Sequence, residues 1–75
     1  MERYQNLSGE SGIYAYEIDD KSIKVQFKDG TFYLYTYESA GESNIEKMKE
    51  LAKAGRGLNG FVMDFVKNKY DSKSY

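Results

Sequence analysis

The 75-residue sequence predicts one small α+β domain, in which a three-stranded antiparallel meander is followed by two helices packed on one of its faces, in the order β-β-β-α-α. Three observations carry this prediction. Residues 23–28 (IKVQFK) alternate between apolar and polar side chains, Asp29-Gly30 is a strong hairpin signal, and residues 45–52 place their apolar side chains at helical spacing. We expect residues 1–10 to form a flexible arm, residues 11–70 the domain, and residues 71–75 a frayed tail.

The predicted strands lie in the first half of the sequence. Residues 13–18 (IYAYEI) are β-branched and aromatic, which is typical of strands, and residues 19–22 (DDKS) form a turn. In the alternating segment that follows, Ile23, Val25 and Phe27 share one face, which we expect to lie against the helices. The third strand covers residues 31–37 (TFYLYTY).

The turn at Asp29-Gly30 permits two registers, which place the tyrosines on opposite faces of the sheet. In a two-residue type I′ turn, Phe32 and Leu34 are buried while Tyr33 and Tyr35 face outward. In a three-residue turn with a glycine bulge the parity reverses, so the tyrosines are buried and Phe32 and Leu34 are exposed. Hydrophobicity slightly favours the first register, because phenylalanine and leucine are buried more often than tyrosine.

Two amphipathic helices are predicted to follow the strands. Ser43 and Glu46 fit a capping box for a helix that runs to Ala54 and ends at Gly55. A second helix is expected over residues 59–69, with Asn59 as its N-cap. The residues expected to form the shared core are Val25, Phe27, Leu51, Phe61 and Phe65.

The composition removes several kinds of chemistry. The chain has no cysteine, histidine, proline or tryptophan, so it lacks a thiol nucleophile, the usual general base and the commonest metal ligand. The adjacent carboxylates Asp19 and Asp20 should point apart in a turn rather than act as an acid–base pair. No apolar run is long enough for a membrane span or a signal peptide. We expect a cytoplasmic, non-catalytic protein that holds no metal and no cofactor.

Charge is unevenly distributed along the chain. The net charge is −1, but residues 1–46 hold nine acidic and four basic side chains, whereas residues 47–75 hold three acidic and seven basic ones. The basic residues of the second half are either the solvated faces of two helices or contacts to phosphate, and Arg56, between two glycines, is the best placed for phosphate. An isoelectric point near 5.4 argues against a strong nucleic-acid binder.

An ordered set of residues adds a family resemblance. The set comprises Ser11, Tyr16, Ile23-x-Val25-x-Phe27, Gly30, Tyr33-x-Tyr35, and Gly55-x-Gly57-Leu58-Asn59 leading to Tyr70. Over about residues 11–70 the sequence resembles the KTSC domain, which is named for the C-terminal extension of some lysyl-tRNA synthetases and also occurs as small stand-alone bacterial and phage proteins. The family usually carries a proline soon after Tyr-x-Tyr and an aromatic residue before the asparagine, and this chain has neither. The synthetase context of the family implies RNA binding.

Two functions remain open at this stage. Tyrosines on a sheet face beside lysines can stack unpaired bases of tRNA or single-stranded RNA, although they are also common packing residues of sheets. The residues assigned to such a site are Tyr33, Tyr35, Lys24, Arg56, Lys53 and Asn59. The alternative is a protein-interaction module or a homodimer that uses an exposed sheet face or edge strand. Outward tyrosines lined by lysine favour RNA, whereas outward Phe32 and Leu34 with Ile13 favour a protein partner.

Overall fold

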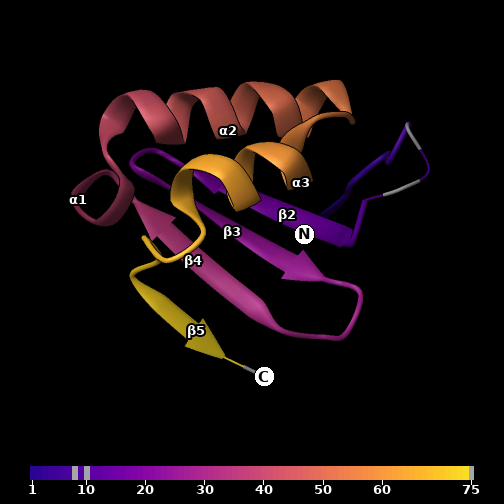
Figure 1. The fold of residues 1–75 in the computed structure, drawn as a ribbon, viewed down its shortest axis with the longest axis horizontal. Coiled ribbons are helices and arrows are strands. Elements are labelled where there is room, and N and C mark those ends of the chain that lie inside the picture. Colours follow the sequence, from indigo (N-terminus) through magenta and orange to yellow (C-terminus); the bar gives the residue numbers. More distant parts are fainter. Residues whose placement is uncertain (8, 10, 75) are drawn as a thin grey trace.

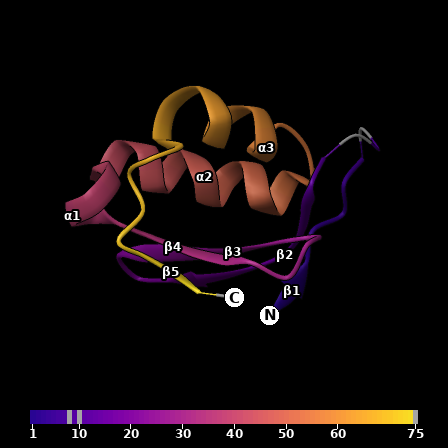
Figure 2. The same cartoon turned by 60° about the horizontal axis from the view of Figure 1, so that its bottom comes forward.

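The computed structural model describes residues 1–7, 9 and 11–74. They form an antiparallel five-stranded sheet in chain order, with the helical segments on one of its faces (Figures 1 and 2). The strands are β1 (Glu2–Arg3), β2 (Ile13–Asp19), β3 (Ser22–Phe27), β4 (Phe32–Thr36) and β5 (Ser72–Ser74), and the helices are α1 (Tyr37–Ala40), α2 (Glu42–Ala54), α3 (Leu58–Phe61) and the π-helix η1 (Val62–Val66). The α+β class and the antiparallel sheet are therefore confirmed. No helix among the described residues is long and apolar enough to cross a membrane.

Two short edge strands extend the three strands that the sequence predicts. β1 pairs with β2 and β5 pairs with β4, so the expected arm and the expected tail each contribute to the sheet. Within the arm, Tyr4 is buried, and its hydroxyl accepts a hydrogen bond from the backbone N–H of Leu58 at 3.3 Å. Ser8 and Glu10 of the arm and Tyr75 of the tail lie outside the described residues.

The hairpin between β3 and β4 has the bulged register, so the preferred prediction that Phe32 and Leu34 are buried in the core is wrong. Tyr35 pairs with Ile23, whose side chain is fully buried under the helices. Because side chains alternate along a strand, Tyr33 and Tyr35 lie on the helix-covered face and Phe32 and Leu34 on the other.

The turn itself explains this register. The backbone N–H of Gly30 donates to the carbonyl of Phe27 at 2.9 Å, and the N–H of Phe27 donates to the carbonyl of Thr31 at 2.9 Å. Gly30 has a φ of 93°, which favours glycine, and the Oδ1 atom of Asp29 accepts the N–H of Thr31 at 2.9 Å. The loop therefore holds three residues, and the third is the glycine of the bulge.

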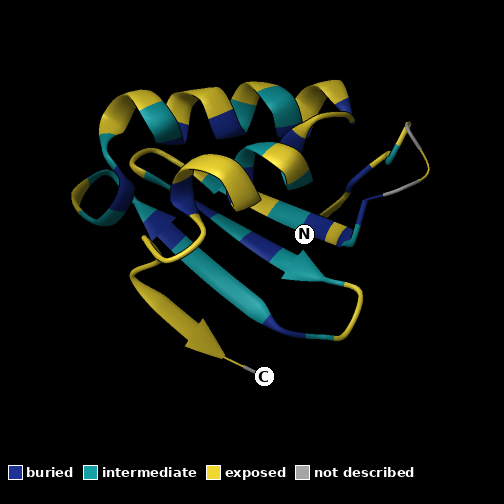
Figure 3. Ribbon diagram, viewed as in Figure 1, coloured by how far each residue is buried: buried dark blue, intermediate teal, exposed yellow. Residues whose placement is uncertain are grey.

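The hydrophobic core lies between the sheet and the helices (Figure 3). Its buried members are Tyr4, Ile13, Ile23, Val25, Tyr35, Ala40, Ile45, Met48, Ala52, Leu58, Val62 and Val66. Of the five residues predicted to form the core, Val25 is fully buried, while Phe27, Leu51 and Phe61 pack against the core and are partly buried. Phe65 is 58% exposed, so its predicted burial is wrong.

The shape of the second helical segment accounts for the exposure of Phe65. After one α-helical turn in α3, the chain continues as the π-helix η1, whose turns are wider because its hydrogen bonds join residues i and i+5. The buried side chains consequently recur at every fourth residue, at Leu58, Val62 and Val66. The helical part ends at Val66, and Gly57 rather than Asn59 occupies the N-cap position, so the predicted span and cap are both wrong.

The start of the first predicted helix also differs from the expectation. α2 begins at Glu42 after Gly41, without a side-chain cap, so Ser43 lies inside the helix and its predicted capping box is wrong. A capping box exists one element earlier, at the start of α1. The Oγ1 atom of Thr36 accepts the N–H of Ser39 and the Oγ atom of Ser39 accepts the N–H of Thr36, both at 3.0 Å.

The end of α2 at Gly55 is as predicted. Gly55 has a φ of 76°, and its N–H donates back to the carbonyl oxygens of Leu51 and Ala52. Its carbonyl accepts the N–H of Leu7 at 2.8 Å, and a Cβ atom at this position would lie 2.7 Å from the Cβ atom of Gln5. The glycine thus both ends the helix and lets the N-terminal arm pack closely against it.

Candidate functional site

The sheet residues assigned to an RNA site lie on different faces. Tyr35 is 1% exposed, so its ring is a core residue and is not available to stack on a base. Burial also raises the pKa of Tyr35. Lys24 pairs with Leu34 on the open face of the sheet, the side opposite to Tyr33. Tyr33 alone among these three residues is half-buried on the helix side, where a ligand can reach it.

The assigned residues near the helix ends do not join Tyr33 either. Lys53 and Arg56 are exposed at the end of α2 and in the glycine joint that follows. Lys53 borders a separate hollow that also contains Glu2 and Glu17, whose carboxylates are unfavourable for phosphate. Asn59 is half-buried in α3 and does not cap the helix. The structure therefore brings none of these three residues together with the tyrosine.

A different set of side chains surrounds Tyr33, and we call their site the aromatic hollow. It has a volume of about 290 Å³ and lies between the β3–β4 hairpin, η1 with the residues after it, and β5. Its lining residues are Phe27, Asp29, Tyr33, Tyr35, Val62, Met63, Lys67, Asn68, Tyr70 and Lys73. Figure 1 shows the segment that follows η1 passing beside β4 and returning as β5.

Aromatic rings build the wall of this hollow. The ring of Tyr33 meets Tyr70 edge to face at a centroid distance of 5.1 Å and Phe27 at 5.3 Å. The buried Tyr35 stacks on Tyr33 from the core side at 6.3 Å, which fixes the orientation of the outer ring. Tyr70 is 38% exposed and Met63 is 46% exposed, so apolar surface at the hollow is accessible.

The hollow carries both signs of charge, with an excess of positive charge. Lys67 and Lys73 line it together with Asp29, and the Nζ atom of Lys73 lies 5.4 Å from the ring centroid of Tyr33. The pKa of Asp29 is lowered, mainly because its carboxylate accepts hydrogen bonds from Thr31 and to a lesser extent because Lys73 is near. The carboxylate is therefore ionised at neutral pH, and two ammonium groups outweigh it.

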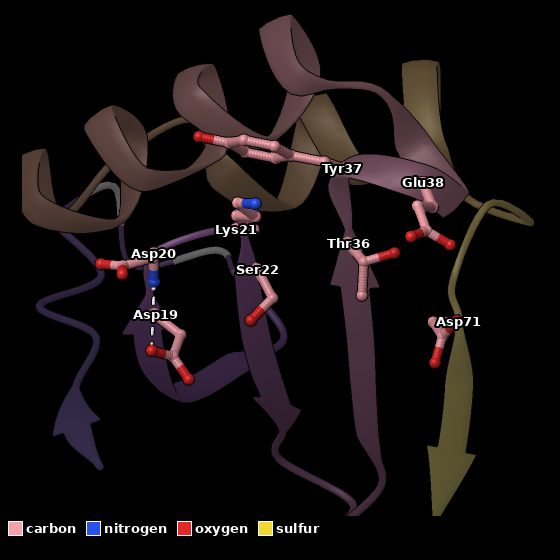
Figure 4. Close-up of a pocket in the computed structure, with 8 residues that line it drawn as sticks. All are labelled: Asp19, Asp20, Lys21, Ser22, Thr36, Tyr37, Glu38 and Asp71. Atoms are coloured by element: carbon pink, nitrogen blue, oxygen red, sulfur yellow. Dashed lines mark hydrogen bonds between the residues drawn. The ribbon is translucent and has the colours of Figure 1, made fainter.

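A larger hollow of about 490 Å³ lies at the opposite end of the strands, where β2 turns into β3 and β4 ends (Figure 4). Its acidic residues are Asp19, Asp20, Glu38 and Asp71. These carboxylates do not converge on one point in Figure 4, and Oδ1 of Asp19 accepts the N–H of Asp20 at 3.1 Å within the turn. Among the described residues, no group of three or more acidic side chains is placed to hold a metal ion. The turn predicted over residues 19–22 is confirmed at Asp20 and Lys21, while Asp19 ends β2 and Ser22 begins β3.

Tyr37 at the edge of this acidic hollow belongs to a polar cluster that joins α1 to α2. Its hydroxyl donates to Glu46 at 2.6 Å, and this hydrogen bond raises the pKa of Tyr37 to about 12. Lys49 contacts the same carboxylate at 2.8 Å and lowers the pKa of Glu46. Lys49 also donates to the backbone carbonyl of Asp20 at 2.8 Å, so the cluster ties the helices to the β2–β3 turn. These contacts explain the cluster as a structural one.

The face of the sheet away from the helices is the third candidate, and we call it the open sheet face. Phe32 and Leu34 lie on it and are half-buried, whereas Tyr33 and Tyr35 lie on the helix side, so the composition of this face favours a protein partner over RNA. A bulge between Ile13 and Ala15 leaves Tyr14 41% exposed, with the guanidinium of Arg3 4.2 Å from its ring centroid. Ile13, whose exposure beside Phe32 and Leu34 would have favoured the protein-partner alternative, is 1% exposed and lies in the core.

The sequence did not mark Lys67, Lys73 or Tyr70 as site residues, because the two lysines belong to the basic residues of the second half and Tyr70 only to the set that carries the family resemblance. These residues come close to Tyr33 because β5 pairs with β4. A strand of only three residues is too short to show the alternating pattern by which strands are predicted. Searches of protein-family models, of curated proteins and of solved structures found no match to this chain.

Proposed function

We propose that this chain is a small non-catalytic RNA-binding domain that holds single-stranded RNA at the aromatic hollow. The observation that carries the proposal is the half-buried ring of Tyr33 against the exposed ring of Tyr70, beside Lys67 and Lys73. Unpaired bases stack on such rings, and ammonium groups of this kind contact phosphates. The resemblance to KTSC domains supports the same function, because both tyrosines belong to the residues on which that resemblance rests.

The dimensions of the hollow favour a single strand over a duplex. About 290 Å³ lies at the lower limit of ligand pockets, which suits one base rather than a larger group. A base must leave its stack to enter such a site, and only single strands, loops and ends present bases in that way. Because the net charge of the chain is −1, we expect modest affinity with a small electrostatic part.

Fluorescence anisotropy with labelled single-stranded oligonucleotides, tRNA and a matched duplex tests this proposal. With two phosphates contacted, log K should fall with log salt at a slope of roughly −1.4, which is roughly sevenfold weaker binding between about 50 and 200 mM salt. Tyr70→Ala should weaken binding by about 1–3 kcal/mol, and Lys67→Ala should flatten the slope by roughly 0.7. Tyr14→Ala, which removes an exposed ring outside the hollow, is the matched control and should bind as the wild type does. If neither tRNA nor any single strand binds at low salt, the proposal fails.

A protein-interaction or homodimerising function is the second candidate, and the position of Phe32 and Leu34 on the open sheet face favours it. A flat sheet face with accessible apolar side chains can pack against a second sheet. Sedimentation over a wide range of protein concentrations tests for the homodimer, and Leu34→Lys should shift any dimer towards monomer. A chain that remains monomeric at all concentrations contradicts the homodimer.

A further inference from the structure

The rim of the aromatic hollow holds a carboxylate that the proposed RNA-binding function does not use. Asp29 is the one acidic residue among the described residues that line the hollow, and it is exposed to solvent. Its Oδ1 atom accepts the backbone N–H of Thr31 at 2.9 Å, which anchors the carboxylate to the hairpin that also carries Tyr33. Besides its role in the turn, this carboxylate disfavours a nearby phosphate, and its remaining lone pairs can accept hydrogen bonds from a base instead.

We propose that Asp29 makes the aromatic hollow selective for guanine in single-stranded RNA, an inference that rests on the proposed RNA-binding function. An ionised carboxylate only accepts hydrogen bonds, and it accepts them at two oxygens. Guanine presents two adjacent donors, N1–H and N2–H, on its Watson–Crick edge, which a single-stranded base leaves available. Adenine, cytosine and uracil each present an acceptor next to their donor, and that acceptor would face a carboxylate oxygen.

The surroundings of Asp29 suit this role. Its hydrogen bonds with Thr31 keep the group ionised at neutral pH, and each carboxylate oxygen has two lone pairs, so Oδ1 can accept a second hydrogen bond. The rings of Tyr33 and Tyr70 line the same hollow, so a base that stacks there has its edge within the reach of the rim. Lys73 borders the hollow as well and offsets the negative charge of Asp29 for an approaching phosphate.

The test uses short oligouridine RNAs of one length that differ only in the central base, which is uracil, guanine, adenine, cytosine or hypoxanthine. Hypoxanthine keeps N1–H but lacks the 2-amino group of guanine. We expect the guanine RNA to bind about fivefold or more tightly than the uracil RNA, which is the lower end of the discrimination that a bidentate side chain provides. The hypoxanthine RNA should lose most of this advantage, because one of the two hydrogen bonds is missing.

Asp29→Asn is the matching variant, because Asn-Gly favours the same kind of turn and the amide oxygen can still accept the N–H of Thr31. It should bind the uracil RNA at least as tightly as the wild type does and should lose the preference for guanine. Asp64→Asn removes the same charge from an exposed site on η1 outside the hollow, and it should keep the preference.

The outcomes separate this inference from the proposed function. Equal binding of all five RNAs by the wild type, or a guanine preference that persists in Asp29→Asn, overturns the role of Asp29 while RNA binding stands. If none of the RNAs binds, the proposed function itself fails, and the inference fails with it.

Discussion

Replacing Tyr35 by alanine is the most direct test of the hairpin register on which the aromatic hollow depends. Tyr35 is 1% exposed and is among the largest fully buried side chains. Removing a buried aromatic side chain costs about 3–5 kcal/mol, while a 75-residue domain has a total stability of roughly 4–11 kcal/mol. The variant should therefore lose a large share of its stability and melt at least about 12 °C below the wild type.

Phe65→Ala is the matched control, because the helical spacing of the second predicted helix placed Phe65 in the core. The side chain is 58% exposed, and its ring contact is with Phe61 at a centroid distance of 4.8 Å. Its removal should cost no more than about 1 kcal/mol. Comparing the loss of unfolding free energy in Tyr35→Ala with that in Phe65→Ala therefore shows which of the two rings lies in the core.

Urea unfolding followed by far-ultraviolet circular dichroism measures the free energy of unfolding of the wild type and of both variants. The dependence of that free energy on urea concentration should be the same for all three proteins. Because Tyr35→Ala can fail to fold, Tyr35→Phe provides an intermediate variant that keeps the ring and should stay within about 1.5 kcal/mol of the wild type. If Tyr35→Ala costs less than about 1 kcal/mol, the bulged register is refuted, and if Phe65→Ala costs as much as Tyr35→Ala, the exposed position of Phe65 on η1 is refuted.

Three other predictions concern the backbone, the caps and one titrating group. Gly55→Ala should destabilise the fold by about 1–3 kcal/mol, because Gly55 has a positive φ and the added methyl group would collide with the N-terminal arm. Gly60→Ala, whose added methyl group would lie in open space on α3, should instead stabilise the fold by about 0.5–1 kcal/mol in the same urea assay. Thr36→Ala should cost about 1 kcal/mol through the cap of α1, and Ser43→Ala no more than about 0.5 kcal/mol; equal losses would contradict the observed helix start. Tyr37 should ionise near pH 12, above its ordinary pKa of 10.0, so the stability that its neutral form provides is complete below pH 10 and is lost as the pH rises through 12. Ultraviolet titration of the wild type and Tyr37→Phe checks this, and a difference spectrum that titrates near pH 10 would show that the hydrogen bond to its carboxylate partner is absent in solution.

The elements that the sequence predicts well are those whose signals are local. The alternation through Ile23 and Val25 identifies β3, because one face of that strand is buried and the other is not. The apolar spacing through Ile45 and Met48 identifies α2, and Gly55 marks its end, because only a residue tolerant of positive φ closes the helix there. Each of these signals depends on a few neighbouring residues and on no distant contact.

The register of the hairpin could not be predicted in this way, because Asp29-Gly30 is compatible with loops of two and of three residues. The choice between the two registers then depends on whether burying Phe32 and Leu34 is more favourable than burying Tyr33 and Tyr35. These two pairs of side chains differ little in apolar area. The packing of Tyr35 beside Ile23 and under the helices decides the matter, and this contact spans elements that the sequence pattern does not relate to each other.

Two backbone irregularities, the hairpin bulge and the π-helix η1, shape the surroundings of the proposed site, and neither leaves a periodic trace in the sequence. The bulge at Gly30 turns Tyr33 from the open sheet face to the helix side. The π-helix η1 keeps Val66 in the core but leaves Phe65 exposed, and in the segment after η1 the ring of Tyr70 meets Tyr33. π-helical turns are frequent at functional sites. In a uniform α-helix Phe65 would share the apolar stripe with Leu58 and Val62, so its exposure depends on η1, just as the position of Tyr33 on the helix side depends on the bulge.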